Sequence, residues 1–112
     1  MSSFSDKGLL GELEQLVLLA ARRIPDDAYA VSIRDEIQER TGIALSRSSV
    51  YVTLDRLDRK GYVRSWFGDP TQERGGKAKR CFQVTAAGQR ALAEAERVVA
   101  RLRPAAIQRT PQ

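Results

Sequence analysis

Side chains that can bind phosphate gather near the middle of the chain, in a stretch that begins with Ser46. Ser46 is suited to cap the first turn of a helix, and Ser48 and Ser49 follow within that turn. Small hydroxyl side chains and unpaired backbone N–H groups at the start of a helix can approach phosphate oxygens closely. These three serines are therefore predicted to bind phosphate, although capping alone would also explain Ser46.

Four neighbouring residues would add contacts to phosphates and bases: Arg47, Tyr51, Val52 and Arg56. Tyr51 is predicted to donate its hydroxyl to a phosphate while its ring packs on the domain, with pure packing as the alternative. Val52 is suited to meet a thymine methyl group, and both arginines are suited to contact the phosphate backbone or a guanine edge. Taken alone, the stretch also fits an ordinary amphipathic helix with a solvated face.

A second basic group lies further along the chain, around a glycine pair at positions 75 and 76. Arg74, Lys77 and Lys79 surround these glycines, which allow a loop to come close to phosphates. Arg74 is suited to a narrow minor groove. Lys77 and Lys79 are expected to set much of the salt dependence of binding. A basic, glycine-rich loop by itself is also compatible with a merely solvated loop.

Charge is unevenly distributed along the 112 residues. The formal net charge is +5, made up of −3 over residues 1–45, +5 over residues 46–80 and +3 over residues 81–112. An anionic partner such as nucleic acid is therefore expected, with general solubility as the alternative explanation. No apolar run is long enough to span a bilayer, and no signal-peptide pattern is present. We expect a cytoplasmic protein with no membrane partner.

The sequence lacks the residues that most common catalytic mechanisms require. There is no histidine and only one cysteine, Cys81, so metal-assisted hydrolysis and Cys/His or Ser/His/Asp catalysis are not expected. The Gly75–Lys77 segment is not a phosphate-binding loop, because Thr71 and Ala78 stand where that motif requires glycine and a hydroxyl residue. We expect no catalytic residue, no metal and no cofactor. A lone cysteine also fits a reducing compartment.

The elements that position these residues can be read from periodicity and from the signals that start and stop helices. Helices are predicted over Leu9–Arg23, Ala30–Arg40, Ser46–Gly61 and Ala86–Leu102, and strands over Tyr62–Phe67 and Lys79–Val84. This order predicts a mainly α chain with a small β-hairpin, arranged as a winged helix-turn-helix. The third helix would then enter the major groove of double-stranded DNA, and the hairpin tip would lie over the adjoining minor groove or backbone.

Two apolar stripes are predicted to bind a second copy of the chain. The first lies on the first helix and comprises Leu9, Leu13, Leu16 and Ala20. The second repeats in steps of four and three along the last helix and comprises Leu92, Ala95, Val99 and Leu102. Packing of either helix on its own domain is the alternative. The chain is accordingly divided into a winged helix-turn-helix domain at residues 8–85 and a C-terminal dimerisation helix at residues 86–106.

The residues also carry a family resemblance. The segment from Ser48 to Val63 (SSVYVTLDRLDRKGYV) is similar to the recognition-helix signature of the PadR family of bacterial transcriptional regulators. The segment from Arg80 to Gly88 (RCFQVTAAG) resembles the second wing strand of that family and the start of its last helix. The opening helix also matches, so the resemblance covers about residues 10–102. A single C-terminal helix resembles the short subfamily.

This resemblance implies a homodimer that binds a pseudo-palindromic operator, as a repressor released by a small-molecule effector. By position, the DNA-contacting residues of the family correspond here to Ser48, Ser49, Tyr51 and the basic wing residues. Effectors of short PadR-like dimers lie near paired aromatic residues of the last helix, and this chain has none there. We therefore name no effector residues. Trp66, the sole tryptophan, is expected in the core. A winged-helix module that binds protein instead of DNA is the alternative function.

Overall fold

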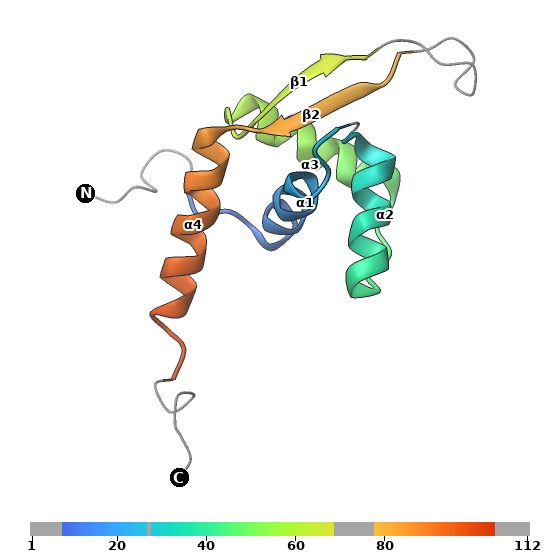
Figure 1. Cartoon of the computed structure of the whole chain (residues 1–112). Coiled ribbons are helices and arrows are strands. Elements are labelled where there is room, and N and C mark those ends of the chain that lie inside the picture. The colour runs from blue at the N-terminus through green and yellow to red at the C-terminus, as the bar shows by residue number, and fades with distance from the viewer. Residues whose placement is uncertain (1–7, 27, 69–77, 105–112) are drawn as a thin grey trace.

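The computed structural model describes residues 8–26, 28–68 and 78–104. Its elements follow one another as α1 (Glu12–Arg22), α2 (Ala30–Thr41), α3 (Arg47–Arg59), β1 (Val63–Phe67), β2 (Arg80–Val84) and α4 (Ala86–Ala100). The hairpin lies across the ends of the three-helix group, and α4 runs away from its base (Figure 1). The predicted order of elements is confirmed, and each boundary agrees to within about three residues.

Local capping signals explain where α3 begins and ends. The Ser46 hydroxyl accepts a hydrogen bond of 3.0 Å from the backbone N–H of Ser49, as expected for an N-cap. At the other end, Gly61 has φ of +82°, a left-handed conformation that glycine adopts without strain. The Tyr62 N–H then donates to the Leu57 carbonyl at 2.9 Å, which closes the helix. The chain can therefore turn directly into β1.

The two strands form an antiparallel hairpin whose register sets which side chains face the helices. Val63 pairs with Val84, Ser65 with Phe82, and Phe67 with Arg80. Paired residues lie on the same face of a hairpin, and Val63 and Phe82 are buried. The free edge of β2 is also attached, because the Phe82 N–H donates to the carbonyl of Ala28 at 2.8 Å. The hairpin is thus fixed to the loop before α2 as well as to α3.

One hydrophobic core joins all four helices to the base of the hairpin. Its fully buried members come from every helix and from both strands: Val17, Leu18, Ile33, Val50, Leu54, Leu57, Val63, Phe82, Leu92 and Ala95. The first half of α4 therefore packs on the chain's own domain. The outer half of α4 does not, since Val99 is 40% exposed and Leu102, just after the helix, is 87% exposed.

This burial corrects the predicted dimer stripes at three positions. Ala20, Leu92 and Ala95 were assigned to the dimer interface, but each is at most 5% exposed within the single chain. Packing against their own domain, the alternative left open by the sequence, accounts for them. Leu9, Leu13, Leu16, Val99 and Leu102 keep exposed or half-exposed side chains. The predicted interface is thereby reduced to these five residues.

The junction between the hairpin and α4 depends on a close approach at Gly88. Thr85 caps α4, because its hydroxyl accepts from the Gly88 N–H at 3.0 Å and donates to the Gly61 carbonyl at 2.7 Å. A Cβ at position 88 would stand 2.2 Å from the Tyr62 carbonyl oxygen. No side chain fits there, so only glycine allows α4 to leave the hairpin at this angle.

We expect Gly88→Ala to lower the free energy of unfolding by about 3 kcal/mol, because the helix must move away from the Tyr62 backbone. Urea unfolding followed by circular dichroism measures this loss. Gly11→Ala is the matched control, since the nearest atom to a Cβ there is 3.7 Å away; it should cost less than about 1 kcal/mol. Equal losses for the two variants would contradict the close-contact explanation.

Candidate nucleic-acid interface

The first turn of α3 projects its polar side chains into solvent. Ser46, Arg47, Ser48 and Ser49 are all exposed, while Val50 directly behind them is fully buried. Val52, one turn further on, is 55% exposed although it is apolar. The serine and valine positions predicted to reach phosphates and bases are therefore accessible, as the prediction requires. A partly unsatisfied helix N-terminus and hydroxyl groups are well suited to phosphate oxygens.

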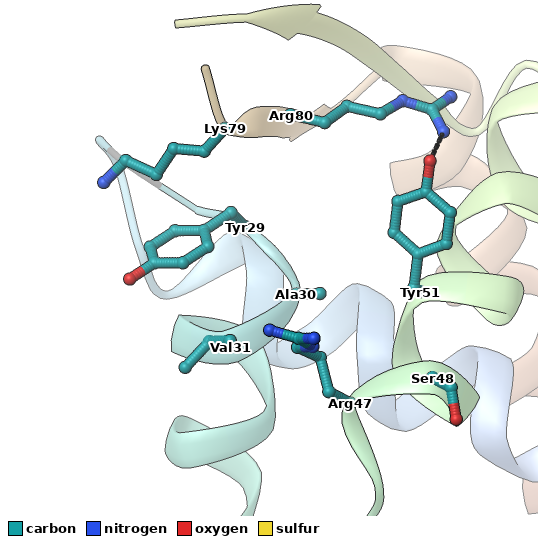
Figure 2. A pocket seen from close by; sticks show the side chains of 8 residues that line it. All are labelled: Tyr29, Ala30, Val31, Arg47, Ser48, Tyr51, Lys79 and Arg80. Carbon is teal, nitrogen blue, oxygen red and sulfur yellow. Dashed lines mark hydrogen bonds between the residues drawn. The ribbon is translucent and has the colours of Figure 1, made fainter. Parts of the chain in front are cut away.

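A groove joins this turn to the start of β2 and to the start of α2. It has a volume of about 390 Å³ and is lined by residues of three elements: Tyr29, Ala30, Val31, Arg47, Ser48, Tyr51, Lys79 and Arg80. Figure 2 shows Tyr29 and Lys79 on one side, Tyr51 and Ser48 on the other, and the Arg47 guanidinium between them. The first turn of α3 and the start of β2 thus share one face of the molecule.

Two tyrosines frame the groove and hold basic side chains. The Lys79 ammonium lies 4.3 Å from the centre of the Tyr29 ring, a cation–π distance. The Tyr51 hydroxyl accepts a hydrogen bond of 2.7 Å from Arg80 Nη1, drawn as the dashed line in Figure 2. The Tyr51 ring meets Phe82 edge-on, with centroids 6.5 Å apart. Its predicted packing on the domain is confirmed, and its hydroxyl reaches the groove.

Tyr29, Val31 and Arg80 were not predicted as site residues. Tyr29 and Val31 come from the start of α2, whose sequence carries no phosphate-binding signal. Arg80 was recognised only as part of the second wing strand and was given no role of its own. Two of the predicted wing contacts, Arg74 and Lys77, lie outside the described residues. Lys79 is the predicted wing residue that the structure places in the groove.

Arg56 faces away from the groove toward α1. Its Nε donates to Glu14 Oε2 at 3.2 Å, and Lys60 Nζ donates to the same oxygen at 2.8 Å. Glu14 is buried, and its other carboxylate oxygen accepts from the Gly11 N–H at 2.9 Å. Arg56 therefore fastens α3 to α1 instead of standing free for DNA. The predicted contact of Arg56 with the phosphate backbone or a guanine edge would require this ion pair to open.

The hydrogen bonds around Glu14 also set its protonation. Burial alone would raise the pKa of this carboxyl, but hydrogen bonds from Lys60, the Gly11 backbone and Arg56 together lower its pKa below the ordinary value of 4.5. Glu14 therefore stays charged at neutral pH. A buried charge with three donors is stable only as long as its partners remain. This cluster ties the second half of α3 to the start of α1.

Trp66 lies on the outer face of the hairpin and not in the core. It is 40% exposed, and the Arg64 guanidinium covers its ring at 4.7 Å. The expectation of a core tryptophan is therefore wrong. Strand alternation places Trp66 on the face opposite Val63, which is the buried one. In the part of the chain that the structure describes, no helix is long and apolar enough to cross a membrane, and no cluster of acidic, Cys or His residues could hold a metal ion.

The sequence profile of the transcriptional regulator PadR-like family matches residues 17–94. The chain belongs to this family. A PadR family transcriptional regulator from Eggerthella lenta DSM 2243 is 26% identical, with a TM-score of 0.67 over 80% of this chain and 73% of that one. A PadR family transcription regulator from Clostridium difficile R20291 is 19% identical, with a TM-score of 0.61 over 82% and 94%. A search of curated proteins finds no match.

Membership in the PadR-like family assigns the chain to a functional class and to a fold. PadR-like proteins are DNA-binding transcriptional regulators and not enzymes, and the mainly helical fold with a two-stranded wing is theirs. A second kind of protein shares the fold: the Aeropyrum pernix ORC1 protein in complex with DNA is 27% identical, with a TM-score of 0.60 over 84% of this chain and 26% of that one. The winged helix-turn-helix predicted from the sequence is confirmed.

We expect Glu14→Gln to cost about 2 kcal/mol of unfolding free energy at pH 7, because Arg56 and Lys60 lose the charge that they share. The lowered folded-state pKa means that the unfolded state takes up the proton first. The contribution of Glu14 is therefore complete above about pH 4.5 and is lost as the pH falls through the folded-state pKa.

Urea unfolding at several pH values tests this expectation. The difference between the wild-type chain and Glu14→Gln should shrink as the pH falls from about 6 to about 3. Glu12→Gln, an exposed position on the same helical turn, is the control and should differ from wild type by less than about 0.5 kcal/mol. A difference for Glu14→Gln that stays constant across the pH range would refute the role of its charge.

Proposed function

We propose that this PadR-like regulator is a homodimeric repressor that binds a pseudo-palindromic DNA operator and is released by a small-molecule effector. The observation that carries the DNA part of the proposal is the shared groove. Arg47 and Ser48 from α3 and Lys79, just before β2 of the wing, line one surface, so a single duplex can touch both elements. The net positive charge and the lone cysteine fit DNA binding in the cytoplasm.

The proposed binding mode assigns different tasks to the two elements. The first turn of α3 enters the major groove, where Val52 contacts a base edge and Ser46, Ser48 and Ser49 contact phosphates. The wing follows the adjoining backbone through Lys79, which shares the groove with the α3 turn; Arg74 and Lys77, which lie outside the described residues, are assigned to the same task from the sequence. Tyr51 and Arg47 stand between these regions and would contact the phosphate that bridges them. Phosphate contacts position the protein, and base contacts specify the sequence.

The exposed apolar residues support the dimer. Leu9, Val99 and Leu102 are each at least 40% exposed, and Leu13 and Leu16 are half-buried on α1. Leu13 and Leu16 lie on α1 and Val99 on α4, while Leu9 comes just before α1 and Leu102 just after α4. A second copy of the chain would cover them by a symmetric contact. Helix α4, which lies within the predicted dimerisation segment at residues 86–106, would then be the dimerisation helix.

Selection of bound duplexes from a random pool tests the function directly. We expect enriched sequences with two inverted half-sites whose centres lie about one or two helical turns apart, because a symmetric dimer presents two α3 helices. Binding should weaken steeply as salt rises. Enrichment of single, unpaired sites would refute the dimeric mode. Failure to bind any duplex would favour the alternative, a winged-helix module that binds protein.

The division between positioning and reading is testable by three substitutions. Lys79→Ala should weaken binding to the selected operator and to random duplex about equally, by about tenfold at physiological salt, because it contacts phosphate. Lys77→Ala should behave in the same way. Val52→Ala should instead change the preferred base at one position of each half-site. If Lys79→Ala changed one base preference and left random-duplex binding intact, the wing would be a reading element.

A further inference from the structure

The side chain of Arg80 is the most highly connected group at the candidate interface. It lies at the start of β2 and is only 17% exposed. Nη1 donates to the Tyr51 hydroxyl at 2.7 Å and to Asp55 Oδ1 at 3.2 Å, and Nη2 donates to Asp58 Oδ2 at 2.7 Å. Nε donates to the Ser65 hydroxyl at 3.2 Å. One guanidinium therefore ties the wing to three successive turns of α3.

The two aspartates would oppose DNA binding if they were left unpaired. Asp55 and Asp58 follow the exposed turn on α3, and their side chains are 36% and 29% exposed. A carboxylate at this place repels phosphate. Arg80 contributes one positive charge to both, and Arg59 also pairs with Asp55. The charges of these four side chains cancel, so the surface beside the groove is left without a net negative charge.

The hydrogen bond from Arg80 to Tyr51 determines whether the Tyr51 hydroxyl can donate its proton to DNA. A phenolic hydroxyl has one proton to donate and lone pairs to accept with. Because Arg80 already donates to the Tyr51 oxygen, the proton of Tyr51 points elsewhere and is available to a phosphate oxygen. Tyr51 lines the groove together with Arg47 and Ser48, so that phosphate would lie between the wing and α3.

We propose that Arg80 is a positioning residue for DNA binding: it fixes the wing against α3, cancels the charge of Asp55 and Asp58, and directs the Tyr51 hydroxyl toward phosphate. Arg80 acts through these neighbours without contacting DNA itself. Burial alone would lower the pKa of Arg80, but its bonds to Tyr51, Asp55 and Asp58 raise the pKa above the ordinary value, so the guanidinium remains charged at every physiological pH. The inference rests on the proposed DNA-binding function.

A double-mutant cycle on DNA affinity separates this role from a merely structural one. We expect Arg80→Gln to weaken binding to the selected operator by about 30-fold. Asp58→Asn should change affinity by less than about twofold in the wild-type chain, because the gain from removing a negative charge is offset by the loss of the Asp58 bond that holds Arg80 in place. In the Arg80→Gln chain the same change should raise affinity by about tenfold. Equal effects of Asp58→Asn in both chains would overturn the charge-cancelling role.

The same cycle with Tyr51→Phe tests the directed hydroxyl. This substitution should weaken binding by about tenfold in the wild-type chain and by less than about twofold in the Arg80→Gln chain. Independent, multiplicative effects would overturn the coupling between the two residues. Circular dichroism at the assay temperature checks that each variant is folded, and Arg80→Lys provides a second variant that keeps the charge but not the multiple bonds. Its affinity should lie between those of wild type and Arg80→Gln.

Arg64→Gln is the matched control from the same hairpin. Arg64 lies on the outer face, where its Nε donates to Gln83 at 2.9 Å and its guanidinium covers Trp66. Its removal should weaken DNA binding by less than about threefold. If Arg64→Gln weakened DNA binding as much as Arg80→Gln does, only the total charge of the wing would matter for affinity. Wild-type chain that binds no duplex would refute the proposed function, whereas wild-type binding that Arg80→Gln leaves intact would refute only this inference.

Discussion

Helix α3 is packed on one side only, and the rest of the DNA-facing surface depends on that constraint. Val50, Leu54 and Leu57 are fully buried in the core, and these residues recur at helical spacing on a single narrow stripe. A wider stripe would draw the opposite face toward the core or toward another helix. Because the stripe is narrow, Ser48 and Val52 remain in solvent. The same residues that stabilise the domain thus leave a free helix surface for DNA.

The packing of α3 also requires that the carboxylates around it be neutralised. Glu14 lies under the helix and binds Arg56 and Lys60, while Asp55 and Asp58 lie beside the wing and bind Arg80. Several of the basic side chains in this region therefore serve the fold. The net charge alone would overstate the number of cations that face DNA. Among the described residues, Arg47 and Lys79 are the cations that line the groove outside this ion-pair network.

Features that depend on residues close in sequence could be predicted, and features that depend on distant ones could not. The caps at Ser46 and Thr85 bond to N–H groups three residues away, and the sequence pattern identifies them. The bonds from Lys60 to Glu14 and from Arg80 to Asp58 join residues 46 and 22 positions apart. Periodicity shows that Trp66 and Val63 lie on opposite faces of a strand, but not which face is covered. The same limit explains why Leu92 was assigned to a partner.

Apolar packing holds the wing at one end of the hairpin and polar bonds hold it further along, and this difference bears on function. At the base, Val63 and Phe82 are buried and bind the hairpin by apolar packing. Four residues along β1, Phe67 is 69% exposed, so packing no longer holds the strands there. The guanidinium of Arg80, which is paired with Phe67 in the register, takes over through polar bonds to α3. Such bonds are directional and depend on charge, whereas apolar packing is not directional. The wing is therefore anchored by the core but oriented by charge, at the place where a phosphate backbone would approach.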